Sequence, residues 1–133
     1  MKIVVAYDGS EPAKRALERA ADMAGDGDQM VVVAAAEPHL RTGIEVGAHL
    51  DPSEVEQRRG DLEEAQQFLT ERGIDAEAVE GQGDPGAFVV EAAKDADLII
   101  IGSRGLNPVQ RLLLGSVSSK VVHRAACDVL VVR

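Results

Sequence analysis

Apolar blocks alternate with helical patterns along the whole chain. Continuous apolar runs predict strands at Lys2–Tyr7, Met30–Ala36, Leu98–Ile101 and Val129–Val132, and an alternating run predicts one more at Ile74–Val79. Only strands covered on both faces can be so continuously apolar, which indicates a parallel sheet between two layers of helices. The alternating strand has one polar side and is therefore expected at an edge of that sheet.

Helix signals lie between the predicted strands. The expected helices begin at Ser10-Glu11-Pro12, Ser53, Asp84-Pro85 and Val117, and they end at about Gly25, Gly73, Ala96 and Ala125. Gly25 is expected in the left-handed conformation, and Ser53-x-x-Glu56 matches a capping box. Residues 38–52 are expected to be irregular. The order β-α-β-α-β-α-β-α-β predicts one α/β domain over residues 1–133.

Composition narrows the possible functions. The chain has 133 residues, of which 45% are hydrophobic and 28% charged, as in globular proteins. The net charge of −9 and the 2% aromatic content disfavour nucleic-acid binding. No apolar run approaches the ~20 residues that span a bilayer, and the single Cys127 excludes an internal disulfide framework. We expect a soluble, cytoplasmic protein with neither nucleic acid nor membrane as partner.

Charge is distributed unevenly along the chain. Residues 1–100 carry 9 Lys/Arg and 22 Asp/Glu, a net charge of −13, whereas residues 101–133 carry 5 Lys/Arg and one acid, a net charge of +4. A basic end on an acidic chain suggests a local anion site. Chance variation over a short segment is an equally good explanation. The acids of the long helix, which include Glu54, Asp61 and Glu64, are expected on a solvated face.

A glycine-rich segment supplies the candidate chemistry. Gly102-Ser103-Arg104-Gly105 follows the fourth strand, and nine residues later Gly115-Ser116 opens the last helix. Glycines let the backbone approach a ligand, and the free amides of a first helical turn attract anions. The hydroxyls of Ser116 and Ser118 and the charge of Arg104 could add contacts to phosphate, with Leu106–Leu114 as a flap. The alternative is a simple turn followed by a helix cap.

The glycine segment and its surroundings resemble the universal stress protein family. The pattern Gly102-x-x-Gly105, nine residues, Gly115-Ser116 is similar to the family's nucleotide signature, and the resemblance covers the whole chain. Other hallmarks are residues 3–10, Gly83-Asp84-Pro85, residues 96–103 and the closing Cys127-x-Val129-Leu130-Val131-Val132. The resemblance implies a Rossmann-like, open parallel sheet of five strands in the order 3-2-1-4-5, with helices on both faces.

The same resemblance implies an ATP-binding regulatory module of the stress response, with Mg²⁺ accompanying the nucleotide. Asp8 would accept hydrogen bonds from the ribose hydroxyls, and Ala6 and Ala35 would line the adenine slot. The residues implied around ribose and phosphates are Ile101, Gly102, Gly105, Gly115, Ser116, Val117 and Ser118. Asp8 could instead serve as a cap for the first helix.

The last strand predicts self-association. Val129–Val132 would be an apolar edge strand, and pairing with a second copy would bury it and give a homodimer, as the resemblance also implies. Two other functions stay open. One is a slow ATPase or autophosphorylating enzyme with Ser116 or Ser118 as acceptor, and the other is a dimeric interaction module that binds no nucleotide.

Some signals receive ordinary structural interpretations. Gly81–Gly86 matches G-x-G-x-x-G, but its helix start carries Asp84, which would repel phosphate, so we interpret it as a turn and a cap. An NADP-dependent enzyme that uses Arg104 stays a distant alternative. His39, His49 and His123 are too few and too scattered for a predicted metal site. Cys127 is interpreted as a small buried residue, and no catalytic residue is predicted.

Overall fold

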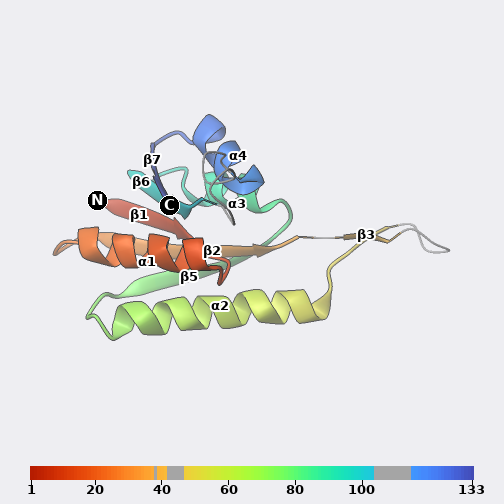
Figure 1. The fold of residues 1–133 in the computed structure, drawn as a ribbon, viewed down its shortest axis with the longest axis horizontal. Coiled ribbons are helices and arrows are strands. Elements are labelled where there is room, and N and C mark those ends of the chain that lie inside the picture. Colours follow the sequence, from red (N-terminus) through yellow and green to blue (C-terminus); the bar gives the residue numbers. More distant parts are fainter. Residues whose placement is uncertain (38, 42–46, 104–114) are drawn as a thin grey trace.

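The computed structural model describes residues 1–37, 39–41, 47–103 and 115–133, with residues 39–41 and 47–49 described by their backbone alone. Five parallel strands form the main sheet in the order β5-β2-β1-β6-β7 (Figure 1). They are β1 (Lys2–Ala6), β2 (Gln29–Ala36), β5 (Ala76–Gln82), β6 (Leu98–Gly102) and β7 (Asp128–Val132). Counted along the chain, this is the predicted order 3-2-1-4-5.

In the described part of the chain, two helices cover each face of the sheet. Helices α1 (Glu11–Met23) and α2 (Pro52–Thr70) lie on one face, and α3 (Pro85–Ala92) and α4 (Ser116–Arg124) lie on the other (Figure 1). This arrangement explains why the central strands are apolar on both sides. The α/β fold with helices on both faces is therefore confirmed.

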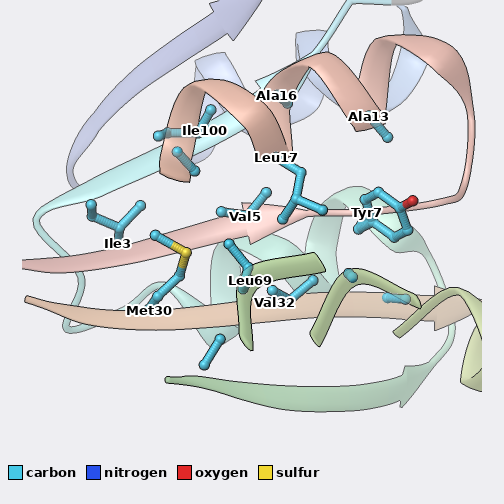
Figure 2. Close-up of a cluster of buried hydrophobic side chains, with 14 of the residues drawn as sticks. Ile3, Val5, Tyr7, Ala13, Ala16, Leu17, Met30, Val32, Leu69 and Ile100 are labelled. Atoms are coloured by element: carbon cyan, nitrogen blue, oxygen red, sulfur yellow. The ribbon is translucent and has the colours of Figure 1, made fainter. Parts of the chain in front are cut away.

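The alternation of side chains along each strand divides the core into two clusters. On the α1–α2 face, Ile3 and Val5 of β1 pack with Leu17 of α1 and Leu69 of α2 (Figure 2). Each of these side chains is almost fully buried, and such burial contributes about 1.5–3 kcal/mol per side chain. The buried cluster under α3 and α4 consists of Val4, Val31, Val33, Val89, Ala93, Ile99, Ile101 and Val121.

Three local predictions are wrong. Residues 38–52 are not wholly irregular, since β3 (His39–Arg41) and β4 (Gly47–His49) pair as an antiparallel ladder. Gly25 does not carry the left-handed turn after α1, because the positive φ of 85° belongs to Gly27. Ser53 is not the cap of α2. Pro52 occupies the first helical turn, where a missing N–H costs nothing, and Asp51 accepts the amide hydrogen bond of Ser53 at 2.9 Å.

The two edges of the sheet differ in character. β5 forms one edge, as its alternating pattern predicted, and its exposed residues are Glu77, Glu80 and Gln82. β7 forms the other edge, where Val129, Leu130 and Val131 are only half-buried.

Helix α3 ends at Ala92, somewhat before the predicted end near Ala96. No helix formed by the described residues combines the length and the apolar composition that crossing a bilayer requires.

Candidate functional site

The candidate site lies where the chain reverses its direction across the sheet. From β1 the chain crosses to β2 by way of α1 on one face, and it returns to β6 by way of α3 on the other face. Such a switch point leaves a crevice beyond the carboxyl ends of the strands. A pocket of about 140 Å³ opens there between the ends of β1, β2 and β6. Pockets that enclose whole ligands are typically about 300–1,000 Å³, so these walls surround only part of a nucleotide-sized molecule.

Small and branched apolar side chains form one part of the pocket wall, and polar groups form the rest. The apolar lining includes Ala6, Ala13, Ala35, Val89, Ile101 and Val117. The ionisable side chains of the described lining are Tyr7, Asp8, Glu37, Glu54 and Arg58. The small apolar side chains and the carboxylates together suit a ligand with an apolar ring and hydroxyl groups.

The turn after β1 aims Asp8 at this pocket. Gly9 has a φ of 77°, which a side chain would strain. The Asp8 carboxylate accepts hydrogen bonds from the Ser10 amide at 3.0 Å and the Ser10 hydroxyl at 2.5 Å. Ser10 in turn accepts the amide hydrogen bond of Ala13 and is the N-cap of α1. Asp8 therefore orders the turn while Ser10 caps the helix, so the alternative in which Asp8 caps the first helix is wrong.

Helix α2 contributes a mostly buried ion pair behind the same turn. The Nη1 atom of Arg58 donates to the Asp8 carbonyl oxygen at 3.1 Å, and Nη2 lies 3.3 Å from the Asp61 carboxylate. Burial raises the pKa of Asp61, although the Arg58 charge acts in the opposite direction. The prediction that Asp61 lies on a solvated helix face is wrong, since only 13% of its side chain is exposed.

Tyr7 closes the core beside the pocket. Its ring belongs to the cluster under α1 and α2, and the hydroxyl lies at the outer end of that cluster (Figure 2). The hydroxyl donates to Glu64 of α2 at 2.8 Å. Burial, followed by the Glu64 hydrogen bond, raises the pKa of Tyr7 above its usual value. Tyr7 therefore stays protonated and serves as a fixed part of the wall.

Gly102 is required by close packing at the end of β6. A Cβ atom built at Gly102 would lie 2.5 Å from the backbone carbonyl of Pro12 in α1. Any side chain would push α1 away from the sheet beside the pocket that Gly102 lines. The first glycine of the sequence signature thus has an observed physical reason.

The N-terminus of α4 differs from those of the other three helices. Ser10, Asp51 and Asp84 cap α1, α2 and α3 with side-chain oxygens, whereas no described side chain caps α4 at Gly115. The Ser118 hydroxyl donates back to the Gly115 carbonyl at 3.1 Å and is buried. The backbone amides of the first turn of α4 are therefore the hydrogen-bond donors that this helix end offers to an anion.

The structure brings most of the predicted residues together. Ala6, Asp8, Ala35, Ile101, Gly102 and Val117 line one pocket. Gly115, Ser116 and Ser118 lie beside Val117 at the start of α4 but are not part of that lining, and Ser116 is exposed. Arg104, Gly105 and the predicted flap Leu106–Leu114 lie outside the described residues.

The sequence analysis gave no site role to two charged residues of the pocket lining, Arg58 and Glu54, and it placed Glu54 on a solvated face. Helical spacing could have found Arg58, because positions 58, 62, 65 and 69 follow the period of a buried helix face. Leu62, Ala65 and Leu69 are indeed buried there. A positive charge on such a face signals a buried partner. Glu37 directly follows the predicted strand Met30–Ala36, and its place beyond the carboxyl end of that strand made it a candidate from the sequence.

The second glycine motif has the expected structural role. A Cβ at Gly81 would collide with the Phe88 ring, and Gly83 has a φ of 111°. Asp84 caps α3 through the Ala87 amide at 2.9 Å and pairs with Lys120 at 2.7 Å. The start of α3 is thus already occupied by a carboxylate. These features explain the motif without a phosphate.

Comparison with known proteins decides the family. The family model described as the universal stress protein family matches residues 1–133. The chain belongs to the universal stress protein family. A universal stress protein of Thermus aquaticus is 41% identical, over 98% of this chain and 97% of the relative.

Solved structures of other universal stress proteins share the fold. One from Archaeoglobus fulgidus in complex with dAMP has a TM-score of 0.78 and 27% identity, over 100% of this chain and 98% of that chain. Another, in complex with cAMP, has a TM-score of 0.75 and 28% identity, over 100% of this chain and 97% of that chain. Adenine nucleotides are therefore bound in these two universal stress proteins.

Proposed function

We propose that this universal stress protein binds ATP in the pocket at the ends of β1, β2 and β6. In this role residues 1–133 act as one nucleotide-dependent regulatory domain of a cytoplasmic stress response. The observation that carries the proposal is the convergence of Ala6, Asp8, Ala35, Ile101, Gly102 and Val117 on one pocket. The adenine nucleotides in the dAMP and cAMP complexes of related proteins support it.

The charges in the pocket suggest how the nucleotide is oriented. On the side of β1, β2 and α2, the three carboxylates of Asp8, Glu37 and Glu54 outnumber the single guanidinium of Arg58, and this excess favours hydroxyl and amino donors over phosphates. The described lining residues on the opposite side, Gly102 and Val117, carry no charge, and the uncapped start of α4 follows. The adenosine end would therefore lie near Ala35 and Asp8, and the phosphates near Gly115–Ser118, with Arg104 and Gly105 as further candidates.

The nucleotide would bring Mg²⁺ with it. Among the described residues, no group of three or more His, Cys, Asp or Glu side chains could hold a metal ion. Mg²⁺ commonly binds through phosphates and retained waters with few protein ligands. The donor set therefore fits a Mg²⁺ ion carried by the phosphates rather than one resident in the protein.

Titration calorimetry with ATP and adenosine tests the adenosine end and the phosphate end of the proposed site separately. Ala35→Leu fills the adenine slot and should weaken both ligands at least about tenfold, or 1.4 kcal/mol. Gly115→Val blocks the amides at the start of α4 and should weaken ATP by a similar factor while adenosine binding stays close to that of the wild type. Ala87→Leu, on the exposed side of α3 and outside the pocket lining, is the matched control.

Wild-type protein that binds neither ATP nor any other adenine nucleotide would leave the interaction module as the better hypothesis. A stability measurement gives a second test, because a ligand at ~100 times its dissociation constant adds ~2.7 kcal/mol. No change in unfolding free energy at millimolar ATP would count against the proposal.

Phosphoryl transfer has one candidate acceptor rather than two. Ser118 is 2% exposed and its hydroxyl is engaged with the Gly115 carbonyl, which disfavours it as an acceptor. Ser116 is exposed at the start of α4. If the protein labels itself with the γ-phosphate of ATP, the label should disappear in Ser116→Ala and persist in Ser118→Ala.

The exposed edge of the sheet supports a homodimer. Pairing of Val129–Val132 with the same strand of a second copy would cover the half-buried apolar side chains of β7. Light scattering at micromolar concentration should then report twice the 14.1 kDa mass of one chain. A monomeric mass would contradict the dimer.

A further inference from the structure

Arg58 occupies an unusual place for a charged residue of a surface helix. It follows the buried face of α2, one turn before Leu62, and only 17% of its side chain is exposed. Its neighbour Arg59 is 61% exposed and pairs with Glu80 of β5. Arg58 instead lines the pocket and reaches the turn that carries Asp8. Two adjacent arginines of one helix thus have opposite environments.

Three contacts connect this guanidinium with the turn, one directly and two by way of Asp61. Its Nη1 donates to the Asp8 carbonyl oxygen at 3.1 Å, and its Nη2 lies 3.3 Å from the Asp61 carboxylate. Asp61 in turn packs against Gly9, where an added Cβ would come within 2.6 Å of its Oδ1 atom. The Asp8–Gly9 segment is therefore fixed on the α2 side by the Arg58–Asp61 pair.

The pair is poorly arranged for stability alone. Within the described part of the chain, Arg58 Nε and Asp61 Oδ2 are buried and form no hydrogen bond, although Oδ2 lies 3.3 Å from Arg58 Nη2 in the ion pair. A buried ion pair with unsatisfied polar atoms costs about as much free energy as it returns, and apolar side chains of similar size commonly stabilise as well or better. A role in the pocket explains why a guanidinium occupies this position on the helix.

We propose that Arg58 is a positioning residue for ribose recognition. By holding the Asp8 carbonyl and, through Asp61, the Gly9 backbone, it fixes the direction of the Asp8 carboxylate before a nucleotide arrives. This inference rests on the proposed function, in which Asp8 accepts hydrogen bonds from the ribose hydroxyls. It adds a residue of α2, a helix outside the glycine signature, to the determinants of nucleotide affinity.

The test compares two probes in the full chain, ATP and 2′,3′-dideoxy-ATP, which lacks both ribose hydroxyls. Arg58→Met should weaken ATP about tenfold, which corresponds to the loss of one well-placed hydrogen bond to a charged group. It should change the dissociation constant of the dideoxy nucleotide less than about twofold. Arg59→Met, one residue along α2, should change neither constant.

Folding is kept separate from positioning by a second variant. Arg58→Met leaves Asp61 as an unpaired buried charge, whereas Arg58→Met combined with Asp61→Leu removes both charges. The double variant should fold and show the same selective loss for ATP. Arg58→Lys keeps the charge but not the planar fork, so it should recover only part of the ATP affinity.

The outcomes divide clearly. Equal loss for ATP and for dideoxy-ATP in the double variant, or no loss for either, would overturn the positioning role while nucleotide binding stands. Wild-type protein that binds neither probe nor any other adenine nucleotide would defeat the proposed function itself, and the inference with it.

Discussion

The charged groups at the amino end and at the carboxyl end of the parallel sheet differ in how completely they are hydrogen-bonded. At the amino end, the Met1 ammonium lies 2.9 Å from Asp28, and Lys2 binds Asp97 through its amide at 2.7 Å and Asp95 through its ammonium at 2.8 Å. These groups satisfy one another with hydrogen bonds, including Asp28 and Lys2, whose side chains are only 17% and 25% exposed. At the carboxyl end, Arg58 and Asp61 are mostly buried and keep unsatisfied atoms among the described residues.

The pKa directions follow the same division. The Gly25 amide and then the Met1 ammonium lower the pKa of Asp28, and the Lys2 ammonium lowers the pKa of Asp95. Burial instead raises the pKa of Asp61. Burial of a carboxylate in this way lowers the stability of the folded state, and proteins tolerate that loss of stability at functional sites. The comparison teaches that charged groups at the amino end support the fold, whereas the buried charges at the carboxyl end are unfavourable for stability and are explained by the nucleotide site proposed there.

The largest expected effect comes from filling the close contact at Gly102. Gly102→Ala places a methyl group against the Pro12 backbone carbonyl and should lower the unfolding free energy by about 3 kcal/mol. Urea unfolding monitored by circular dichroism measures it. Gly60→Ala on α2 meets no atom within 4 Å and should raise stability by about 0.5–1 kcal/mol. Equal stability of the two variants would contradict the packing argument.

A smaller effect is expected at Tyr7. Tyr7→Phe removes the hydroxyl that donates to Glu64 and should cost about 1 kcal/mol, because the well-exposed Glu64 carboxylate regains water. Glu64→Gln keeps an oxygen acceptor and should cost less. Urea titration of both variants gives the comparison, and a Tyr7→Phe variant more stable than the wild type would show that this contact contributes nothing.

The smallest effects are those of pH, and their signs should differ between the two ends. Asp28 has a folded pKa below its unfolded value, so its stabilisation is present above about pH 4 and is lost as pH falls through the folded pKa. Asp61 has a raised folded pKa, so its contribution is present at low pH and is lost as pH rises through that value.

Melting temperatures between pH 7 and pH 3 measure this contrast. The melting temperature of the wild type should exceed that of Asp28→Asn by less at pH 3 than at pH 7. Relative to Asp61→Asn, the melting temperature of the wild type should instead rise as the pH falls. Parallel changes for the two variants would remove the distinction between the ends. The rise in melting temperature with ATP should be the same in Asp28→Asn as in the wild type.

Much of the fold could be predicted because its signals are local. The apolar runs of β1, β2, β6 and β7 and the alternation of β5 depend only on whether each face of a strand is covered. Family resemblance gave the strand order. The caps of α2 and the turn after α1 were mispredicted because neighbouring Ser, Asp, Pro and Gly residues compete for the same role, as Asp51 and Ser53 show.

The candidate site could be predicted only in part. Asp8, Gly102 and Val117 were found because they stand in short motifs at strand and helix ends. Arg58 and Asp61 were not, because their motif is the packing of α2 against a turn fifty residues earlier in the chain. The direction of the Ser118 hydroxyl, toward the Gly115 carbonyl, also depends on the helix that forms around it.

The sequence by itself determined the alternation of strands and helices, the apolar core and the glycines at the switch point, because these depend on local periodicity and on backbone freedom. Only the tertiary structure decided which side chains meet at the carboxyl end of the sheet. The physical reason is that burial of a charge, the approach of a carbonyl to a glycine and the shape of a pocket arise between elements. No single segment of the chain contains them.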